Sequence, residues 1–167
     1  MAKYNVKHLC GHTVTHQIFG TNSHGERDRK IEWLSSIVCL DCARKEALAK
    51  AKEENKSLPQ LKGTEKQVNW AEQIRMNMVP KLKKIREKIA ALLKNPNAKP
   101  YDLKFGEFLL SMIDGLINAN NAAWWIDHRD DYISPEWFQK MISGKKEYIA
   151  AKETLDKEKA EWKANNS

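Results

Sequence analysis

The chain has 167 residues, of which 31% are charged, and carries a formal net charge of +7 at pH 7. This length fits one domain, or a small module followed by one helical domain. No run of about 18 apolar residues is present and the N-terminus lacks an apolar signal core, so we predict neither a transmembrane helix nor a secretory signal and expect a cytoplasmic protein.

The N-terminal third predicts a β-hairpin followed by two helices. Residues 3–19 alternate loosely between apolar and polar, which predicts a hairpin with its turn at Cys10–His12. Residues 26–36 have apolar side chains at helical spacing, and residues 41–55 are rich in Ala, Lys and Glu, so both segments favour helix. A segment this short holds little core of its own, so a bound metal would supply the missing stability.

The three cysteines of the chain and one histidine indicate that metal. Cys10 and His12 flank a glycine, and Cys39 and Cys42 form a Cys-x-x-Cys pair. Zinc favours four tetrahedral thiolate and imidazole ligands, often supplied by two such short pairs. We therefore predict a structural zinc held by these four residues. His8 shares a strand face with Cys10 and competes for the fourth position. The alternative is that Cys39 and Cys42 are apolar fillers at a helix start.

A helical domain is predicted after a break at residues 57–63, where Pro and Gly interrupt the pattern. Thr64 with Gln67 fits a capping box and begins a helix that extends to about residue 93. Pro80 either kinks this helix or starts its continuation. The predicted organisation is a zinc-ribbon-like module with its following helix over 1–56, a linker over 57–63, a helical domain over 64–144 and a charged helical tail over 145–167.

The C-terminal half predicts further helices. Residues 105–120 are rich in apolar side chains, and Ser134 before Pro135 is typical of a helix start. In the tail, Tyr148, Leu155 and Trp162 recur every seven residues, which predicts a seam that packs on the body or on a partner. The alternative for the tail is a solvated helix. The predicted fold class is mainly α with a small β-hairpin: a zinc-ribbon-like N-terminal module plus a helical domain.

Several segments together carry a family resemblance. These are Cys10-Gly-His12, the segment 27–34, Cys39-x-x-Cys42-x-Arg-Lys-Glu, the segment 58–75 with Gly-Thr-Glu-Lys-Gln-Val-x-Trp-Ala-Glu-x-Ile-Arg at its end, and Trp-Trp-Ile-Asp-x-Arg at 124–129. They resemble a family of small, mostly uncharacterised proteins of bacteria, phages and mobile elements that begin with a zinc-ribbon-like module. The resemblance supports the ligand choice above and implies no reaction.

Catalysis finds little support in the sequence. No Gly-rich phosphate-binding loop precedes a helix, and the His128-Arg129-Asp130 triplet lacks the other kinase motifs. Asp127, Asp130 and Asp131 are interpreted as surface charge or partners of Arg129. A metal-dependent enzyme using His128 and these aspartates is the remote alternative, and a small-molecule substrate is not expected.

Charge is distributed unevenly along the helical domain. Residues 63–100 carry nine basic against three acidic side chains, whereas residues 101–133 carry two basic against six acidic ones. In the helix predicted from Thr64 to about residue 93, the outward-facing basic residues are Lys81, Lys83, Lys84, Arg86 and Lys88. A positive helix face suits a phosphate backbone, so we expect these side chains to bind nucleic acid. Alternatively the basic and acidic segments face each other and the lysines form a solvated surface.

Tryptophans suggest a second kind of contact. Trp33 and Trp70 lie on apolar faces and are expected in the core. Trp124 and Trp125 are adjacent, so one helix cannot bury both against one surface, and an exposed one beside Arg129 would suit a protein hot spot or a base-stacking platform. The alternative is that both are buried between two layers of helices. The sequence thus predicts a non-enzymatic accessory protein that contacts nucleic acid or a nucleoprotein complex. The alternative is a phage- or mobile-element-encoded inhibitor of a host defence nuclease, similar in role to anti-CRISPR proteins.

Overall fold

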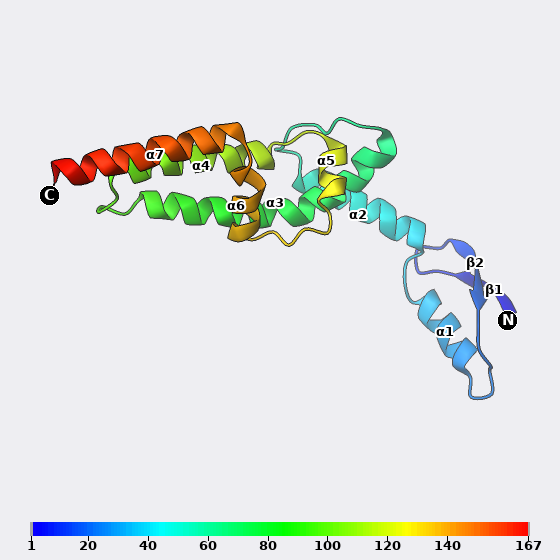
Figure 1. Ribbon diagram of the computed structural model, residues 1–167. Coiled ribbons are helices and arrows are strands. Elements are labelled where there is room, and N and C mark those ends of the chain that lie inside the picture. The colour runs from blue at the N-terminus through cyan, green and yellow to red at the C-terminus, as the bar shows by residue number, and fades with distance from the viewer. Residues whose placement is uncertain (1, 167) are drawn as a thin grey trace. The chain divides into compact units, whose positions relative to one another are not determined.

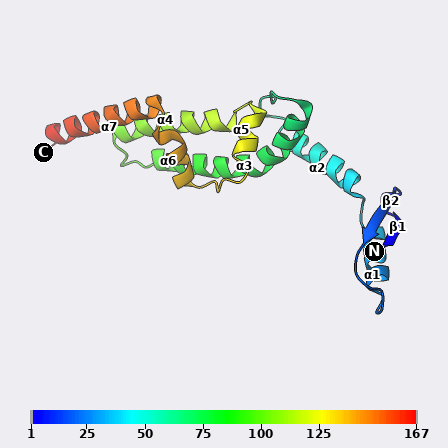
Figure 2. The same cartoon turned by 45° about the vertical axis from the view of Figure 1, so that its right-hand side comes forward.

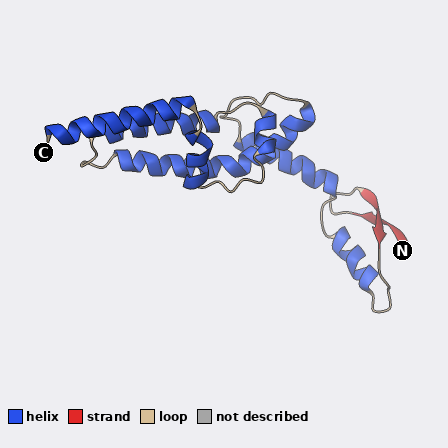
Figure 3. Ribbon diagram, in the orientation of Figure 1, coloured by secondary structure: helices blue, strands red, loops and turns tan. Residues whose placement is uncertain are grey.

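The structure, a computed structural model, describes residues 2–166 and is mainly helical with one β-hairpin (Figures 1 and 3). This confirms the predicted fold class. The chain divides into two compact units between Lys50 and Ala51. Within the described residues, both strands belong to the first unit, and no helix is both long and apolar enough to cross a membrane.

The first unit is built on an antiparallel hairpin. Strand β1 (Ala2–Lys7) pairs with β2 (Thr13–Ile18), with Val6 opposite Val14, and helix α1 (Glu26–Ser35) packs against β1. Alternation along the strands turns Val6 and Ile18 inward, where they meet Leu34 of α1. Only these three apolar side chains are buried in the cluster, so the unit has the small core that the sequence predicted for a metal-stabilised module.

The predicted linker is an integral part of the second unit. Helix α2 (Leu40–Glu54) contains the division between the units, and beyond it Leu61 is buried in the core of the second unit. The backbone of Lys62 donates to Asn120 and accepts from Ala122. Pro and Gly therefore mark an ordered turn whose main-chain groups are paired, and the expected boundaries at 57 and 63 do not separate compact units.

Two long helices form the centre of the second unit. Helix α3 (Glu65–Leu93) begins at the predicted Thr64–Gln67 capping box and continues through Pro80, and α4 (Pro100–Ile117) lies beside it in both views of Figures 1 and 2. Helix α4 begins at Pro100, earlier than the predicted residue 105, because proline suits the first turn of a helix. Gly106 allows a close approach, since a Cβ there would overlap the side chain of Leu93.

Three further helices complete this unit: α5 (Ala122–Asp127), α6 (Pro135–Ser143) and α7 (Lys146–Asn165). The expected separate tail is α7, which packs on α4 (Figure 2). Tyr148 is buried against two phenylalanines of α4, and Trp162 meets the Tyr101 ring edge-on with centroids 6.1 Å apart. The seven-residue seam therefore packs on the body of the protein, and α7 is not a solvated extension.

Candidate metal centre and basic helix

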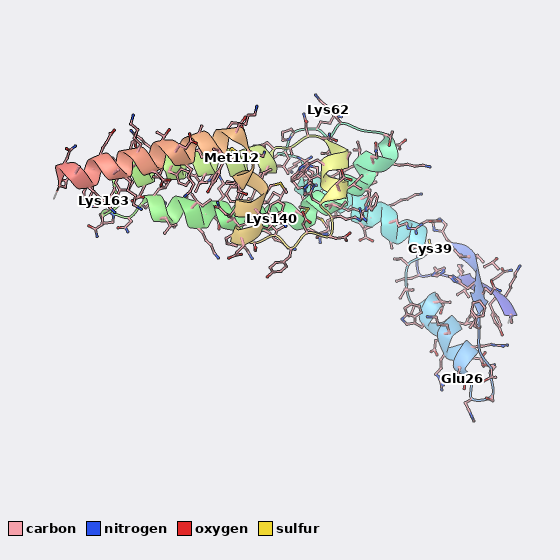
Figure 4. All side chains as sticks on the ribbon, in the orientation of Figure 1. Glu26, Cys39, Lys62, Met112, Lys140 and Lys163 are labelled. Carbon is pink, nitrogen blue, oxygen red and sulfur yellow. The ribbon has the colours of Figure 1, made fainter. Side chains whose placement is uncertain are left out.

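The hairpin turn and the start of α2 bring the four predicted ligands together. Gly11, between Cys10 and His12, has a φ of 82°, and its N–H donates to the His8 carbonyl at 2.8 Å. Glycine adopts this left-handed conformation without the steric cost that a Cβ imposes. Cys39 directly precedes α2, where Figure 4 labels it, and Cys42 lies in the first turn of that helix.

The geometry of the four side chains matches a small tetrahedral site. The ligand atoms of Cys10, His12, Cys39 and Cys42 all lie within 4.8 Å of one another. The Nδ1 atom of His12 is 3.2 Å from Cys42 Sγ and 3.7 Å from Cys39 Sγ. A zinc tetrahedron with sulfur and nitrogen arms of about 2.3 and 2.1 Å has S···N edges of about 3.6 Å. The observed separations therefore fit a metal ion at the centre, and the tetrad could hold one.

The thiols of the tetrad differ in their protonation. The backbone N–H of Cys39 donates to Cys10 Sγ at 3.3 Å, and this bond, with that of the His12 N–H, lowers the pKa of Cys10 to about 6. Hydrogen bonding to Cys39, followed by desolvation, raises the pKa of Cys42 to about 11. Three sulfurs this close repel one another once ionised, so without a cation one thiol ionises readily while another keeps its proton. A bound divalent cation would offset this repulsion and allow all three thiols to be ionised.

His8 does not compete for the fourth ligand position. Its side chain is buried, its Nδ1 lies 3.2 Å from the Ile37 carbonyl, and its Nε2 lies 2.8 Å from Nε2 of His16. Because a carbonyl only accepts, Nδ1 of His8 carries the hydrogen, and Nε2 then accepts from His16. Both ring nitrogens are occupied. His12 is the histidine of the tetrad, and His8 ties the hairpin to the segment that precedes Cys39.

The predicted phosphate-binding side chains do not all remain free. Lys81, Lys83, Lys84 and Lys88 are exposed on α3, and none forms an ion pair within 4 Å in residues 2–166. Lys88 nonetheless lies near Glu136 of α6, whose pKa is lowered chiefly by the Ser134 hydroxyl and further by this lysine. Arg86 instead forms a two-pronged ion pair with Asp114 of α4, at 2.6 and 3.1 Å. This contact raises the pKa of Arg86. This arrangement matches the alternative in which the basic and acidic segments face each other and the lysines form a solvated surface.

The predicted protein-binding residues separate in the fold. Trp125 is fully buried and donates from Nε1 to the Ala119 carbonyl at 2.9 Å, so it is not available to a partner. Trp124 is half-buried and stacks on His128 with ring centroids 4.5 Å apart. Neither tryptophan of this pair is exposed, which agrees with the alternative that both pack into the interior of the unit. Arg129, the third residue of this set, is exposed.

Asp127, Asp130 and Asp131 do not converge with His128 into a metal site. Within the described part of the chain, the Cys/His tetrad is the only group of at least three potential ligands close enough to share an ion. Asp131 accepts from the indole of Trp137 at 2.9 Å, and Asp130 pairs with Arg129. Asp130 is thus the predicted partner of Arg129 and Asp127 is exposed, whereas Asp131 is half-buried with an indole as its partner.

An exposed aromatic site was missed at Trp70. This side chain is 49% exposed, and the Arg129 guanidinium lies 5.5 Å from its ring centroid. Trp33 is also about half exposed, with the Lys30 ammonium 3.9 Å from its ring centroid. Both were predicted in the core. Helical spacing predicted burial because both residues lie next to the apolar face of their helix. An indole at the edge of such a face is large enough to extend into solvent.

Comparison with protein-family models, curated proteins and solved structures finds no match to this chain. The function must therefore be inferred from the residues themselves.

Proposed function

We propose that this protein is a non-enzymatic binding protein with a structural zinc in its first unit and a nucleic-acid-binding face on helix α3. The observation that carries the nucleic-acid assignment is the row of exposed lysines on one side of that helix, of which Lys88 lies near the carboxylate of Glu136. The family resemblance to proteins of phages and mobile elements suits such an accessory role, in which the chain contacts nucleic acid or a nucleoprotein complex.

Zinc is the metal that the donor set favours. Three thiolates and one imidazole form a soft, nitrogen-containing set that excludes the oxygen-seeking ions Mg²⁺ and Ca²⁺. Four protein ligands leave no open position for a reacting water, which is the arrangement of structural rather than catalytic zinc. The role of the metal is to hold the hairpin turn against the start of α2, next to a core of only three buried apolar side chains.

The lysine face has the geometry of a backbone-binding surface. Lys81, Lys84 and Lys88 follow each other at spacings of three and four residues, so they share one side of α3 and span about 10 Å. Leu82 and Ile85, between them in sequence, are buried and fix which side faces outward. Positive charges held on a rigid helix neutralise phosphates without reading sequence, and each contact releases counterions.

Salt dependence of binding tests this proposal. Affinity for nucleic acid should fall linearly with salt on a double-logarithmic plot, and reversing Lys84 and Lys88 to Glu should reduce the slope by about two or more. Reversing Lys152 and Lys157 to Glu, which are exposed on α7, is the matched control with the same change in net charge. Absence of binding at low salt, or equal losses in both double variants, would contradict the proposed face.

A second candidate function, the protein-directed inhibitor, is favoured by the exposed apolar side chains of the first unit. Leu9 and Leu40 adjoin the tetrad and are 70% and 64% exposed, and Phe19 at the end of the hairpin is 66% exposed. Exposed apolar side chains on a turn that a bound metal would hold rigid suit a protein interface. Capture of a defence nuclease that survives nuclease treatment and is lost in a Leu9→Ser/Leu40→Ser variant would support this role over nucleic-acid binding.

A further inference from the structure

We propose that Trp70 and Arg129 form a stacking site for an unpaired base, which makes single-stranded nucleic acid the ligand class of the α3 face. This inference rests on the proposed nucleic-acid binding. It identifies the kind of strand that the face selects, which the lysines alone do not determine.

Trp70 lies outside the packed interior. It belongs to neither hydrophobic cluster of the described residues, although Val68 and Ala71 on either side pack into the larger one. Nearly half of its surface is exposed. The cluster thus fixes the backbone of α3 at this point while the indole remains accessible. A large apolar ring with a rigid base and an open surface is what base stacking requires.

Arg129 holds the ring and adds positive charge. Its guanidinium lies 5.5 Å from the Trp70 ring centroid, and its Nη1 donates to the Ile126 carbonyl at 3.0 Å, which fixes the side chain to the end of α5. Arginine planes stack on aromatic faces and contact phosphate oxygens at the same time. Asp130 opposes this, because its carboxylate lies 3.2 Å from Nε of Arg129. That ion pair is solvent-exposed and therefore weak.

The stacking site and the lysine face lie on one side of the same helix. Trp70, Asn77, Lys81, Lys84 and Lys88 are all exposed and recur at intervals of seven, four, three and four residues, which is one stripe of an α-helix. Trp70 precedes Lys81 by about 16 Å along the axis, so the stripe from Trp70 to Lys88 extends about 27 Å. A strand following it would contact lysines through its backbone and place a base on Trp70 at one end.

This arrangement discriminates between strands. In a duplex the bases are stacked on one another inside the helix, so their faces are not available to an indole without flipping a nucleotide out. In a single strand every base has a free face, and one stacking contact strengthens binding without reading sequence. The lysines should therefore bind both forms, and Trp70 should add affinity for the single strand alone.

The test compares fluorescently labelled oligo(dT), oligo(U) and a duplex of the same length, titrated with the intact protein in fluorescence anisotropy. Trp70→Ala should weaken binding of both single strands by about 5- to 150-fold and leave duplex binding unchanged. Trp70→Phe should retain most of the affinity, and Tyr132→Ala, at an aromatic that is 83% exposed in the same unit, should change nothing. Asp130→Asn should strengthen single-strand binding, because it frees Arg129 for a phosphate.

The possible outcomes distinguish failure of the stacking site from failure of the proposed nucleic-acid binding. Loss of binding in the Lys84/Lys88 reversal with no effect of Trp70→Ala would overturn the stacking site and leave the nucleic-acid face intact. Equal losses for duplex and single strand in Trp70→Ala would also overturn it, as would a tighter duplex than single-strand complex in the parent protein. If the parent binds none of the three probes at low salt, both proposals fail. Preference between oligo(dT) and oligo(U) identifies DNA or RNA as the source of the strand.

Discussion

Removal of the metal should unfold the first unit and leave the second folded. The most direct perturbation is Cys39→Ser, because Cys39 is the buried member of the tetrad and its N–H also donates to Cys10. Serine keeps the approximate shape of the side chain but is a poor ligand for zinc. His12→Ala removes the imidazole arm and should have the same consequence.

The magnitude follows from how little else holds this unit. Its core cluster contains the three buried side chains of Val6, Ile18 and Leu34, and burying each contributes about 1.5–3 kcal/mol. A structural zinc contributes about 10–16 kcal/mol in small metal-folded domains. The metal term therefore exceeds the whole apolar term of this cluster. Losing it should leave the unit below the threshold of folding, because conformational entropy opposes the folded state for every ordered residue.

Amide NMR spectra give the decisive measurement. With Cys39→Ser, or after chelation of the parent protein, cross-peaks from the first unit should collapse into the narrow range of unfolded chains while those of the second unit keep their positions. His24→Ala, at an exposed histidine of the same unit outside the tetrad, is the matched control and should change neither set. Less than about a tenth of an equivalent of zinc in the purified parent, with dispersed peaks from the first unit, would refute the reasoning.

Four further predictions concern protonation and packing. Because the pKa of Cys42 is raised to about 11, its thiol is protonated at neutral pH in the metal-free protein and ionised in the complex. Lower pH therefore favours the metal-free state, and zinc affinity should fall by up to about tenfold per pH unit for each proton displaced, with at least one proton per metal in calorimetry across two buffers. Glu72→Ala should destabilise the second unit by about 3 kcal/mol in denaturant unfolding, because it leaves the buried Arg75 guanidinium without its carboxylate. Arg75→Met should destabilise the unit as well, by about 2 kcal/mol or more, because it leaves the buried Glu72 carboxylate without its cation and the Pro59 carbonyl without a donor. A loss below about 1 kcal/mol would show that the buried guanidinium, whose Nε and Nη2 have no hydrogen-bond partner within residues 2–166, is itself costly. Gly106→Ala should destabilise by about 1–2 kcal/mol in thermal melts through its overlap with Leu93, and should become stabilising in a Leu93→Ala background, where only helix propensity remains.

The sequence alone determined the local features of this protein. Apolar spacing predicted the helices and the hairpin, and residue chemistry predicted the cap at Thr64. The spacing of Cys10, His12, Cys39 and Cys42 predicted a metal tetrad whose ligand atoms the fold brings within 4.8 Å of one another. The helices, the hairpin and the cap depend on residues close in sequence. The tetrad could be predicted because the chain has only three cysteines, and all three fit the spacing of metal ligands.

Tertiary structure decided the features that depend on which distant side chains meet. The His8–His16 pair and the Arg86–Asp114 ion pair join positions 8 and 28 residues apart, and no local pattern distinguishes them from free groups. The burial of a tryptophan side chain also depends on residues that are distant in sequence. Trp70 lies on an apolar helical face and was expected in the core, yet it is left at the rim beside Arg129, whereas Trp125 on α5, which packs against α3, is fully buried. Burial depends on the position of the neighbouring helices, and that position follows from the packing of the whole unit.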